Sequence, residues 1–429
     1  MFKRRDINAL SPIELDNYIH ALDIVRARSL ANPDDPLGYD WHARRHNDPQ
    51  VGPCEHGSDL FFAWHRCHLH YFEQLLRGTD PPRTSEVCIP YWDWSRTDPM
   101  GGRYPARFQL ASLQGDRFSQ GVALHAATIS IVKDTRGASE FGGWPKGTPG
   151  KNYGNFELGP HNYMHGQYIG GLMGDPSTAA EDPIYWSFHC FIDLLWHEWQ
   201  RRNPDQAVTS PTAVLRGFAG EPKTRVLEFQ SLPALGYEYE YNAALLADFA
   251  SPIAAVLLAE SQMIGRLDPS FTGAVNEQFL ISRKAAFSLS SELPALKRSW
   301  VVIHDVSLPI VGSFTLNVYV HPRDQAWPEG ARLDSSSPFY AGDASIWKVH
   351  SGNASQGHGG HHSEPHHPVS AHMRVEATSV IERLNLAGQN DLIVTLQFIP
   401  APMPDGSPAR VPELLRQVDL REVVLEGVI

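Results

Sequence analysis

The chain has 429 residues, more than one compact core usually contains, so a large domain and a smaller one are expected. Its net charge of −12 argues against a nucleic-acid partner, which requires a basic surface. No apolar run reaches the length of about 18 residues that a membrane span requires, so no membrane partner is expected.

The chain begins with paired basic residues at Arg4 and Arg5, and no apolar stretch follows them, so no signal peptide is expected. Four cysteines are too few for a disulfide scaffold in a chain of this length, and they suit a reducing compartment. We therefore expect a cytoplasmic location, with export alongside a partner left open. The sequence does not indicate an oligomeric state.

Three segments have the apolar spacing of helices. Residues 11–30 begin with Ser11-Pro12, a suitable cap and first turn, while residues 61–76 and 183–199 are apolar on several sides, as buried helices are. Residues 98–160, between the second and third helices, are rich in Gly and Pro and are predicted to form long loops. Long ordered loops are usually functional.

The character of the chain changes after about residue 241. Residues 315–320 and 392–396 are rich in β-formers and are predicted to be strands. The expected organisation is a mainly α domain over residues 1–242, a partly helical connector over 243–289 and a smaller β-rich domain over 290–429. Residues 351–368, rich in Gly, Ser and His, are expected to form a mobile loop.

The 21 histidines are the unusual feature, because they gather in two clusters. In the second cluster, His161 and His165 are four residues apart, so on a helix both imidazoles share one face and can bind one metal ion, with His189 on an apolar helix as a third ligand. The first cluster repeats this plan around His65. A single histidine pair is more often an ordinary surface or core pair. Two such clusters beside Trp and Phe favour a dinuclear site in a helix bundle.

The types of ligand restrict the metal. Di-iron bundles use carboxylates and Glu-x-x-His pairs, which these helices lack. Structural zinc recruits thiolates, and hydrolytic zinc has a carboxylate base beside it. Neutral imidazoles suit copper, which also heads the divalent affinity order. An all-histidine pair of sites therefore suggests two copper ions that change redox state with dioxygen.

The motifs around these histidines resemble those of tyrosinases and related polyphenol oxidases. The residues that carry the resemblance are His56-x4-Phe61-Phe62-Ala63-Trp64-His65-Arg66-x2-Leu69-x3-Glu73, Pro90-Tyr91-Trp92-Asp93-Trp94, Asp182-Pro183-x-Tyr185-Trp186-x2-His189-x3-Asp193 and Leu235-Gly236-Tyr237-Glu238-Tyr239. Together with the start of the chain they span residues 4 to 241. In one departure, Phe188 precedes His189 where many members have a second histidine.

The resemblance implies a type 3 dicopper centre in an antiparallel helix bundle with long loops. It assigns His46, His56 and His65 to the first copper ion, and His161, His165 and His189 to the second. His42 is an alternative to His46, one helical turn away. Asp193, one turn after His189, is expected to orient its helix through a charged partner such as Arg66.

Cys54 precedes His56 by two residues, and in several similar tyrosinases a cysteine at this position is bonded to the imidazole as a thioether. We expect this crosslink here, the alternative being a small buried residue. The other cysteines are expected to be packing residues. His68 and His70 lie off the face of His65 and are interpreted as surface residues or as neighbours of the ligands.

The resemblance also implies a function, the oxidation of small phenols by dioxygen. Hydroxylation of a monophenol requires loss of a proton with a pKa of about 10, so a base beside the copper helps. Competent members of the family are thought to use a glutamate and an asparagine that hold an activating water. Glu157 and Asn162 stand at these positions, which predicts activity on monophenols and o-diphenols. A catechol oxidase, an o-aminophenol oxidase and a dicopper oxygen carrier remain alternatives.

The β-rich domain resembles, more loosely, the C-terminal domains that cover the active site in latent members of the family. We expect one of its aromatic side chains to enter the substrate pocket, with Phe339, Tyr340 and Trp347 as candidates. The histidine-rich loop over 350–372 either captures copper for delivery or is a flexible polar loop.

Overall fold

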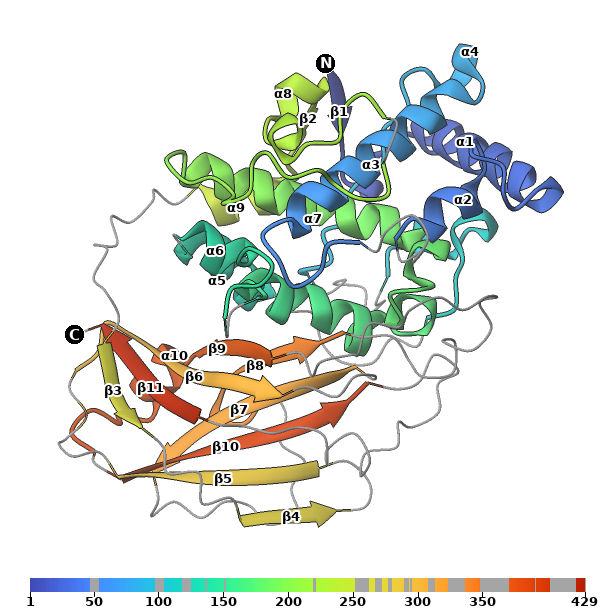
Figure 1. Cartoon of the computed structure of the whole chain (residues 1–429). Coiled ribbons are helices and arrows are strands. Elements are labelled where there is room, and N and C mark those ends of the chain that lie inside the picture. Colours follow the sequence, from blue (N-terminus) through green and yellow to red (C-terminus); the bar gives the residue numbers. More distant parts are fainter. Residues whose placement is uncertain are drawn as a thin grey trace.

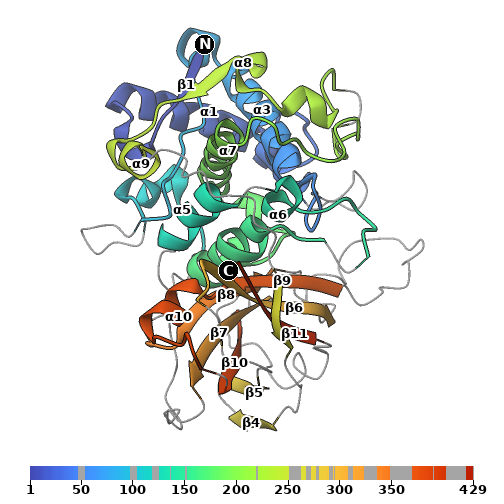
Figure 2. The same ribbon diagram turned by 90° about the vertical axis from the view of Figure 1, so that its left-hand side faces the viewer.

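The computed structural model describes residues 1–46, 54–96, 104–117, 125–135, 137–149, 152–218, 221–250, 262–266, 272–276, 280–288, 293, 295–307, 313–322, 336–347, 370–389, 391–401 and 422–428. They form a helical domain and a β-domain that lie one above the other in both views (Figures 1 and 2). The predicted combination of a mainly α domain and a β-rich C-terminal domain is confirmed.

The helical domain is built around two long buried helices. Its α-helices are α1 (Pro12–Ala31), α2 (Tyr39–Arg44), α3 (Phe61–Gly78), α4 (Pro81–Thr84), α5 (His125–Asp134), α6 (Ala138–Gly142), α7 (Ile184–Arg202), α8 (Leu232–Leu235) and α9 (Ala243–Phe249). Helices α1, α3 and α7 confirm the three predicted ones. Helix α1 begins as predicted, because Ser11 and Glu14 form a reciprocal capping box around Pro12. Helices α3 and α7 pack against each other and bury residues on every side, as their apolar composition predicts.

The Gly- and Pro-rich region contains more helix than predicted. Besides α5 and α6, the π-helical segments η4 (Glu157–His161) and η5 (Met164–Ile169) lie between α3 and α7 in the chain. Pro160 has no N–H to donate, and Gly159 departs from helical geometry, so regular α-helix is interrupted here. Loop-forming composition therefore hid these short helices, of which α5 packs against α7.

The ends of the helical domain pair with each other. Strand β1 (Phe2–Arg4) runs parallel to β2 (Tyr237–Tyr239), with Phe2 opposite Tyr237. The start of the chain is thus bound to a segment near the end of the domain, and helix α9 after it buries Leu245 and Phe249 in the same core.

The β-domain contains two antiparallel sheets among its described residues. One has the strand order β4-β5-β10-β7-β8 and the other β3-β11-β6-β9. The bounds are β3 (Gln262–Arg266), β4 (Thr272–Asn276), β5 (Leu280–Ser288), β6 (Arg298–Ser307), β7 (Phe314–Pro322), β8 (Tyr340–Ile346), β9 (Ser370–Glu376), β10 (Asp391–Pro400) and β11 (Glu422–Val428), with helix α10 (Thr378–Arg383) between β9 and β10. Strands β7 and β10 confirm the two predicted strands.

The connector differs from its prediction. It begins with helix α9, but strands β3, β4 and β5 fall within 243–289 and pair with strands of the β-domain, so that domain begins near residue 262 rather than 290. These strands are short or carry Gly and charged residues, so their sequences lack a clear alternating pattern. The loop predicted over 351–368 lies outside the described residues.

Each of the two hydrophobic cores includes side chains from the other domain. Trp347, directly after β8, is buried in the core of the helical domain, while Tyr153 and Leu158 of the helical domain are buried in the core of the β-domain. No described helix is long and apolar enough to cross a membrane.

Candidate metal centre

Helices α3 and α7 meet at two histidines. His65 and His189 are both buried, and their imidazoles stack with ring centroids 4.2 Å apart and an interplanar angle of 2°. Each ring lies in the packed interface of the two helices, where water has no access. These two helices therefore hold one ligand candidate of each predicted copper set.

The π-helical segments supply two more. His161, at the end of η4, and His165, in η5, have ring centroids 4.6 Å apart and no solvent exposure. The metal-binding atoms of His161, His165 and His189 all lie within 4.8 Å of one another. The structure thus brings together the three residues predicted for the second copper ion.

His46 and His56 complete the cluster. His46 follows α2, and its metal-binding atom lies within 4.8 Å of those of His65 and His189. His56 lies between the two sets: its ring is 5.2 Å from His65 and 5.3 Å from His161. Its side chain is 18% exposed, and this makes it the most accessible of the six.

His42 lies away from this cluster. Its Nε2 atom is 3.2 Å from the carbonyl oxygen of Pro36, and its ring packs against Trp41 and Phe72. It appears in none of the potential metal-binding groups of the described chain. The geometry therefore favours His46 over His42 as a ligand.

The two remaining histidines of α3 are buried rather than on the surface. His68 contacts the Tyr185 hydroxyl and the His42 carbonyl, and His70 lies beside Gln74. The ring of Tyr185 in turn packs against His46 and His189. His68 is therefore a neighbour of the ligand candidates.

The hydrogen bonds of the six imidazoles leave ring nitrogens free for a metal. Nδ1 of His46, His65 and His165 each lies 2.7–2.9 Å from a backbone carbonyl, of Pro176, Phe61 and Met173 respectively. Because a carbonyl only accepts hydrogen bonds, these Nδ1 atoms carry the proton and the Nε2 atoms hold a lone pair.

The free nitrogens are buried and have no other partner. Those without a hydrogen bond are Nε2 of His46, His56, His65 and His161 and Nδ1 of His189. Nε2 of His165 and Nε2 of His189 lie 3.3 Å apart. Buried polar atoms are nearly always satisfied, so this concentration of free lone pairs fits a pair of metal ions bound by imidazoles.

Burial keeps these imidazoles neutral. It lowers the pKa of His46 and of His56 to about 3, and it lowers the pKa of His65, His161, His165 and His189 well below the ordinary value. Neighbouring imidazoles add to the effect at five of them, since two adjacent positive charges repel. Only neutral imidazole binds a metal ion.

Glu157 and Asn162 each contact a ligand candidate. The Glu157 carboxylate is fully buried and accepts hydrogen bonds from Nδ1 of His56 at 2.8 Å and from the backbone N–H of Gly57 at 3.0 Å. Burial raises the pKa of Glu157 well above its usual range, against a lowering by the Gly57 bond. Oδ1 of Asn162 lies 2.9 Å from Nδ1 of His161. Among the described residues no hydrogen bond joins Glu157 to Asn162.

Cys54 lies beside two of the imidazoles. Its sulfur and the nearest ring nitrogens of His46 and His56 are all within 4.8 Å of one another. The thiol is buried, and burial raises the pKa of Cys54 well above its usual value, as do the nearby carboxylates. The position is suitable for a bond to His56, which remains a prediction.

Trp347 of the β-domain enters the centre. Its indole lies parallel to the His165 imidazole, with centroids 3.8 Å apart and an interplanar angle of 18°, and it is 5.2–5.8 Å from the rings of His46, His56 and His161. The other candidates stay in the β-domain: Phe339 packs against His321, and Tyr340 donates to Asp343.

A buried charge cluster, Arg4, Arg66, Glu73, Asp193, Tyr237 and Tyr239, links the two ligand helices to the domain ends. The Asp193 carboxylate accepts from Arg66, as predicted, and also from Arg4 and both tyrosines. Glu73 completes the cluster with a 2.9 Å bond from Arg4. The roles of Arg4 and Glu73 were missed, because their partners are far away in the sequence.

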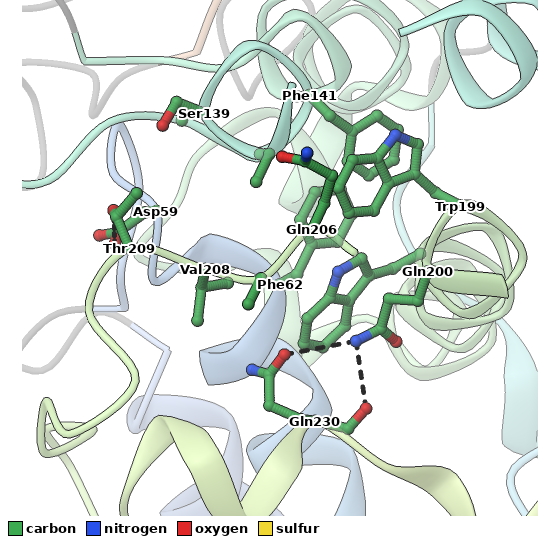
Figure 3. Close-up of a pocket in the computed structure, with 15 residues that line it drawn as sticks. Asp59, Phe62, Ser139, Phe141, Trp199, Gln200, Gln206, Val208, Thr209 and Gln230 are labelled. Atoms are coloured by element: carbon green, nitrogen blue, oxygen red, sulfur yellow. Dashed lines mark hydrogen bonds between the residues drawn. The ribbon is translucent and has the colours of Figure 1, made fainter. Parts of the chain in front are cut away.

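A separate small pocket lies between α3, α6 and α7 (Figure 3). It is lined by Phe62, Phe141 and Trp199, with Gln200 and Gln230 bonded at its edge. Its free volume of about 10 Å³ holds about one water molecule, so it cannot hold a substrate.

Comparison with known proteins identifies the centre. The sequence profile of the tyrosinase family, described as the common central domain of tyrosinase, matches residues 36–121 and 111–202, which contain all six histidines. Residues 36–202 thus match the central domain of the tyrosinase family of type 3 copper proteins. The cofactor of this family is a pair of copper ions with dioxygen as co-substrate, and the free imidazole nitrogens fit it.

The similarity to curated tyrosinases is confined to part of each protein. Tyrosinase HcTyr1 of Hahella sp. (strain CCB-MM4) is 29% identical over 226 residues, 46% of this chain and 48% of that protein. Tyrosinase of Streptomyces glaucescens is 28% identical over 207 residues, 39% of this chain and 73% of that protein. Catechol oxidase B of Solanum tuberosum is 29% identical over 213 residues, which are 39% of this chain and 35% of that protein. The chain thus spans about half the length of HcTyr1.

Solved structures share the fold over nearly the whole chain. Latent apple tyrosinase superposes with a TM-score of 0.65 at 18% identity, covering 100% of this chain and 96% of that one. A latent aurone synthase gives a TM-score of 0.65 at 16% identity, covering 99% of this chain and 89% of that one. A functional unit of Octopus hemocyanin gives 0.62 at 16% identity, covering 100% of both. These identities establish the fold and leave the reaction undecided.

Proposed function

We propose that this chain oxidises phenols with dioxygen, hydroxylating monophenols to o-diphenols and oxidising o-diphenols to o-quinones, and that its β-domain keeps the intact chain latent. The observation that carries the proposal is the position of Trp347. A flat aromatic ring lies parallel to a ligand imidazole, among six histidines of which five are buried. A space that accepts an indole in this way also suits a phenol ring.

The copper pair, when bound, would supply the binding of dioxygen and the transfer of electrons from the phenol to it. The chain supplies fixed ligands, because backbone carbonyls hold Nδ1 of His46, His65 and His165 and turn Nε2 inward. It also excludes water from the centre, since five of the six ligand imidazoles are buried.

Glu157 would take up the phenolic proton. A free phenol has a pKa of about 10 and is mostly neutral at pH 7, so an adjacent base favours the reactive phenolate. The buried Glu157 carboxylate, with its raised pKa, is a stronger base than a solvated glutamate. Asn162, which contacts His161, would hold the water that carries the proton.

The β-domain would have to move before a substrate could bind. The Trp347 indole lies where a ring stacked on His165 would lie, so a phenol and this side chain exclude each other. Latent apple tyrosinase and the latent aurone synthase share this two-domain fold, which agrees with latency.

Oxygen uptake by the copper-loaded protein tests the proposal. A protease site placed in residues 251–261 would allow the β-domain to be cut off, and uptake would be measured with a monophenol and then a catechol, before and after the cut. We expect both substrates to be oxidised and the cut to increase both rates. Catechol oxidation alone would favour a catechol oxidase or o-aminophenol oxidase, and reversible oxygen binding without turnover would favour an oxygen carrier.

A further inference from the structure

Asn162 contacts both domains. Its side-chain oxygen lies 2.9 Å from Nδ1 of His161, and its side-chain nitrogen donates to the backbone carbonyl of Ser345, in β8, at 2.8 Å. The residue is 2% exposed, so its amide is buried while the domains are docked. One side chain of the metal centre is thus hydrogen-bonded to the β-domain.

We propose that the docked β-domain blocks monophenol hydroxylation a second time, independently of Trp347, by occupying an N–H of the Asn162 side-chain amide. The Ser345 carbonyl accepts the bond that a water would otherwise accept. A pocket emptied of the indole would then admit a phenol but lack the positioned water. This inference rests on the proposed function, in which Asn162 is a positioning residue for that water.

The two blocks are separable because β8 is held by its own sheet. Thr315 of β7 pairs with Ser345, their hydroxyls are 2.7 Å apart, and Phe314 pairs with Ile346. These contacts fix the Ser345 carbonyl without help from the indole two residues later. Truncating Trp347 therefore opens the ring site and leaves the carbonyl in place.

Docking has other contacts that survive loss of the indole. Gln167 in η5 donates from its side-chain amide to the Ile399 carbonyl in β10 at 3.1 Å, and Arg374 in β9 pairs with Glu140 in α6. Gln167 offers a matched control, since it forms the same kind of bond to the β-domain but contacts no ligand imidazole among the described interactions.

The test compares three copper-loaded forms: full-length wild type, full-length Trp347→Ala, and the helical domain that is left when the β-domain has been cut off and removed. We expect Trp347→Ala to oxidise catechols while its β-domain is still docked. Docking is checked by gel filtration of the protease-cut variant, in which the two domains should elute together. Its ratio of monophenol to catechol turnover should be about 100-fold below that of the separated helical domain, the size of effect of a lost proton-transfer partner. If the alanine variant releases the β-domain, Trp347→Leu, which fills part of the space, replaces it.

A second readout needs no metal and no turnover. Hydrogen exchange of the asparagine side-chain amides, followed by NMR in metal-free protein labelled with ¹⁵N-asparagine, reports the Ser345 bond directly. The Asn162 signal, identified by its loss in Asn162→Leu, should be protected in wild type and in Trp347→Ala and should exchange faster after separation.

Gln167→Leu weakens docking without touching Asn162. It should raise monophenol and catechol turnover in parallel after the cut, because Trp347 and the Ser345 carbonyl leave the helical domain together. An equal turnover ratio in Trp347→Ala and in the separated domain would overturn the inference, as would an Asn162 amide that exchanges freely in the docked protein. Failure of the separated domain to hydroxylate monophenols would instead overturn the proposed function, whatever the exchange data show.

Discussion

Glu157 lies 2.8 Å from Nδ1 of His56, so the same carboxylate that would accept the phenolic proton also orients a ligand candidate. The bond fixes the imidazole with its proton on Nδ1 and its Nε2 lone pair toward the centre. Substitutions at Glu157 can separate these two roles.

Glu157→Gln should lower monophenol turnover about 100-fold and leave catechol oxidation nearly unchanged. The amide oxygen still accepts hydrogen bonds from His56 and Gly57, but the amide cannot take a proton. Glu157→Ala removes both roles and should also weaken copper binding about 10- to 100-fold. Steady-state oxygen uptake and copper content after dialysis distinguish the variants. Unchanged monophenol turnover in Glu157→Gln would reject the base.

Copper content distinguishes His46 from His42. His46→Ala removes a nitrogen that faces His65 and His189, so we expect about half of the copper to be lost. His42→Leu removes a bond to Pro36 in a packed site and should lower the midpoint of thermal unfolding while both copper ions stay bound. Metal analysis with thermal unfolding measures both. The opposite pattern would make His42 the ligand.

Acid should destabilise the metal-free protein. Burial lowers the pKa of His46 and His56 to about 3 in the folded state, whereas an unfolded histidine has a pKa of about 6.5. Below about pH 6.5 the unfolded chain therefore binds more protons than the folded chain, and stability falls as pH decreases toward 3. Urea unfolding at pH 7, 6 and 5 should show this decrease. The decrease should be smaller in His46→Leu, and an identical slope in the two proteins would contradict the assignment.

The thioether between Cys54 and His56 can be detected by mass. Formation of the carbon–sulfur bond removes one hydrogen from the thiol and one from the ring, with dioxygen as the oxidant. We expect the copper-loaded protein, after exposure to air, to yield a crosslinked peptide lighter by two hydrogen atoms. Metal-free protein and Cys54→Ser are the controls. A free Cys54 thiol in the copper-loaded protein would reject the crosslink.

The charge cluster should make Asp193 important for stability. Asp193→Ala would leave the buried guanidinium groups of Arg4 and Arg66 without this carboxylate, which typically costs about 3–5 kcal/mol. The free energy of unfolding in urea measures the loss. Arg5→Ala at the partly exposed pair with Glu14 is the control and should cost about 1 kcal/mol or less. Equal losses in the two variants would mean that the cluster adds no more than a surface pair.

Short-range sequence patterns were sufficient to predict the long helices and the histidines that gather in the metal centre. Ser11 and Glu14 define the start of α1, and the apolar residues around His65 and His189 identify two buried helices. Contacts between distant segments were not accessible in this way. Neither the bond from Asn162 to a backbone carbonyl nor the pairing of Arg4 with Glu73 leaves a local pattern. Strands β3 and β5 were not predicted, because their partners β11 and β10 lie more than a hundred residues later in the sequence.

The exchange of core side chains affects the lifetime of the opened protein. When Trp347 leaves the helical domain, Tyr153 and Leu158 lose the β-domain core that covers them. Leu158 directly follows Glu157, so the segment that holds the proposed base would lose its packing at the moment it gains access to substrate. Two newly exposed apolar side chains also promote association between molecules. An opened molecule should therefore inactivate sooner than a closed one, and activation would be an irreversible, short-lived event rather than a repeatable switch.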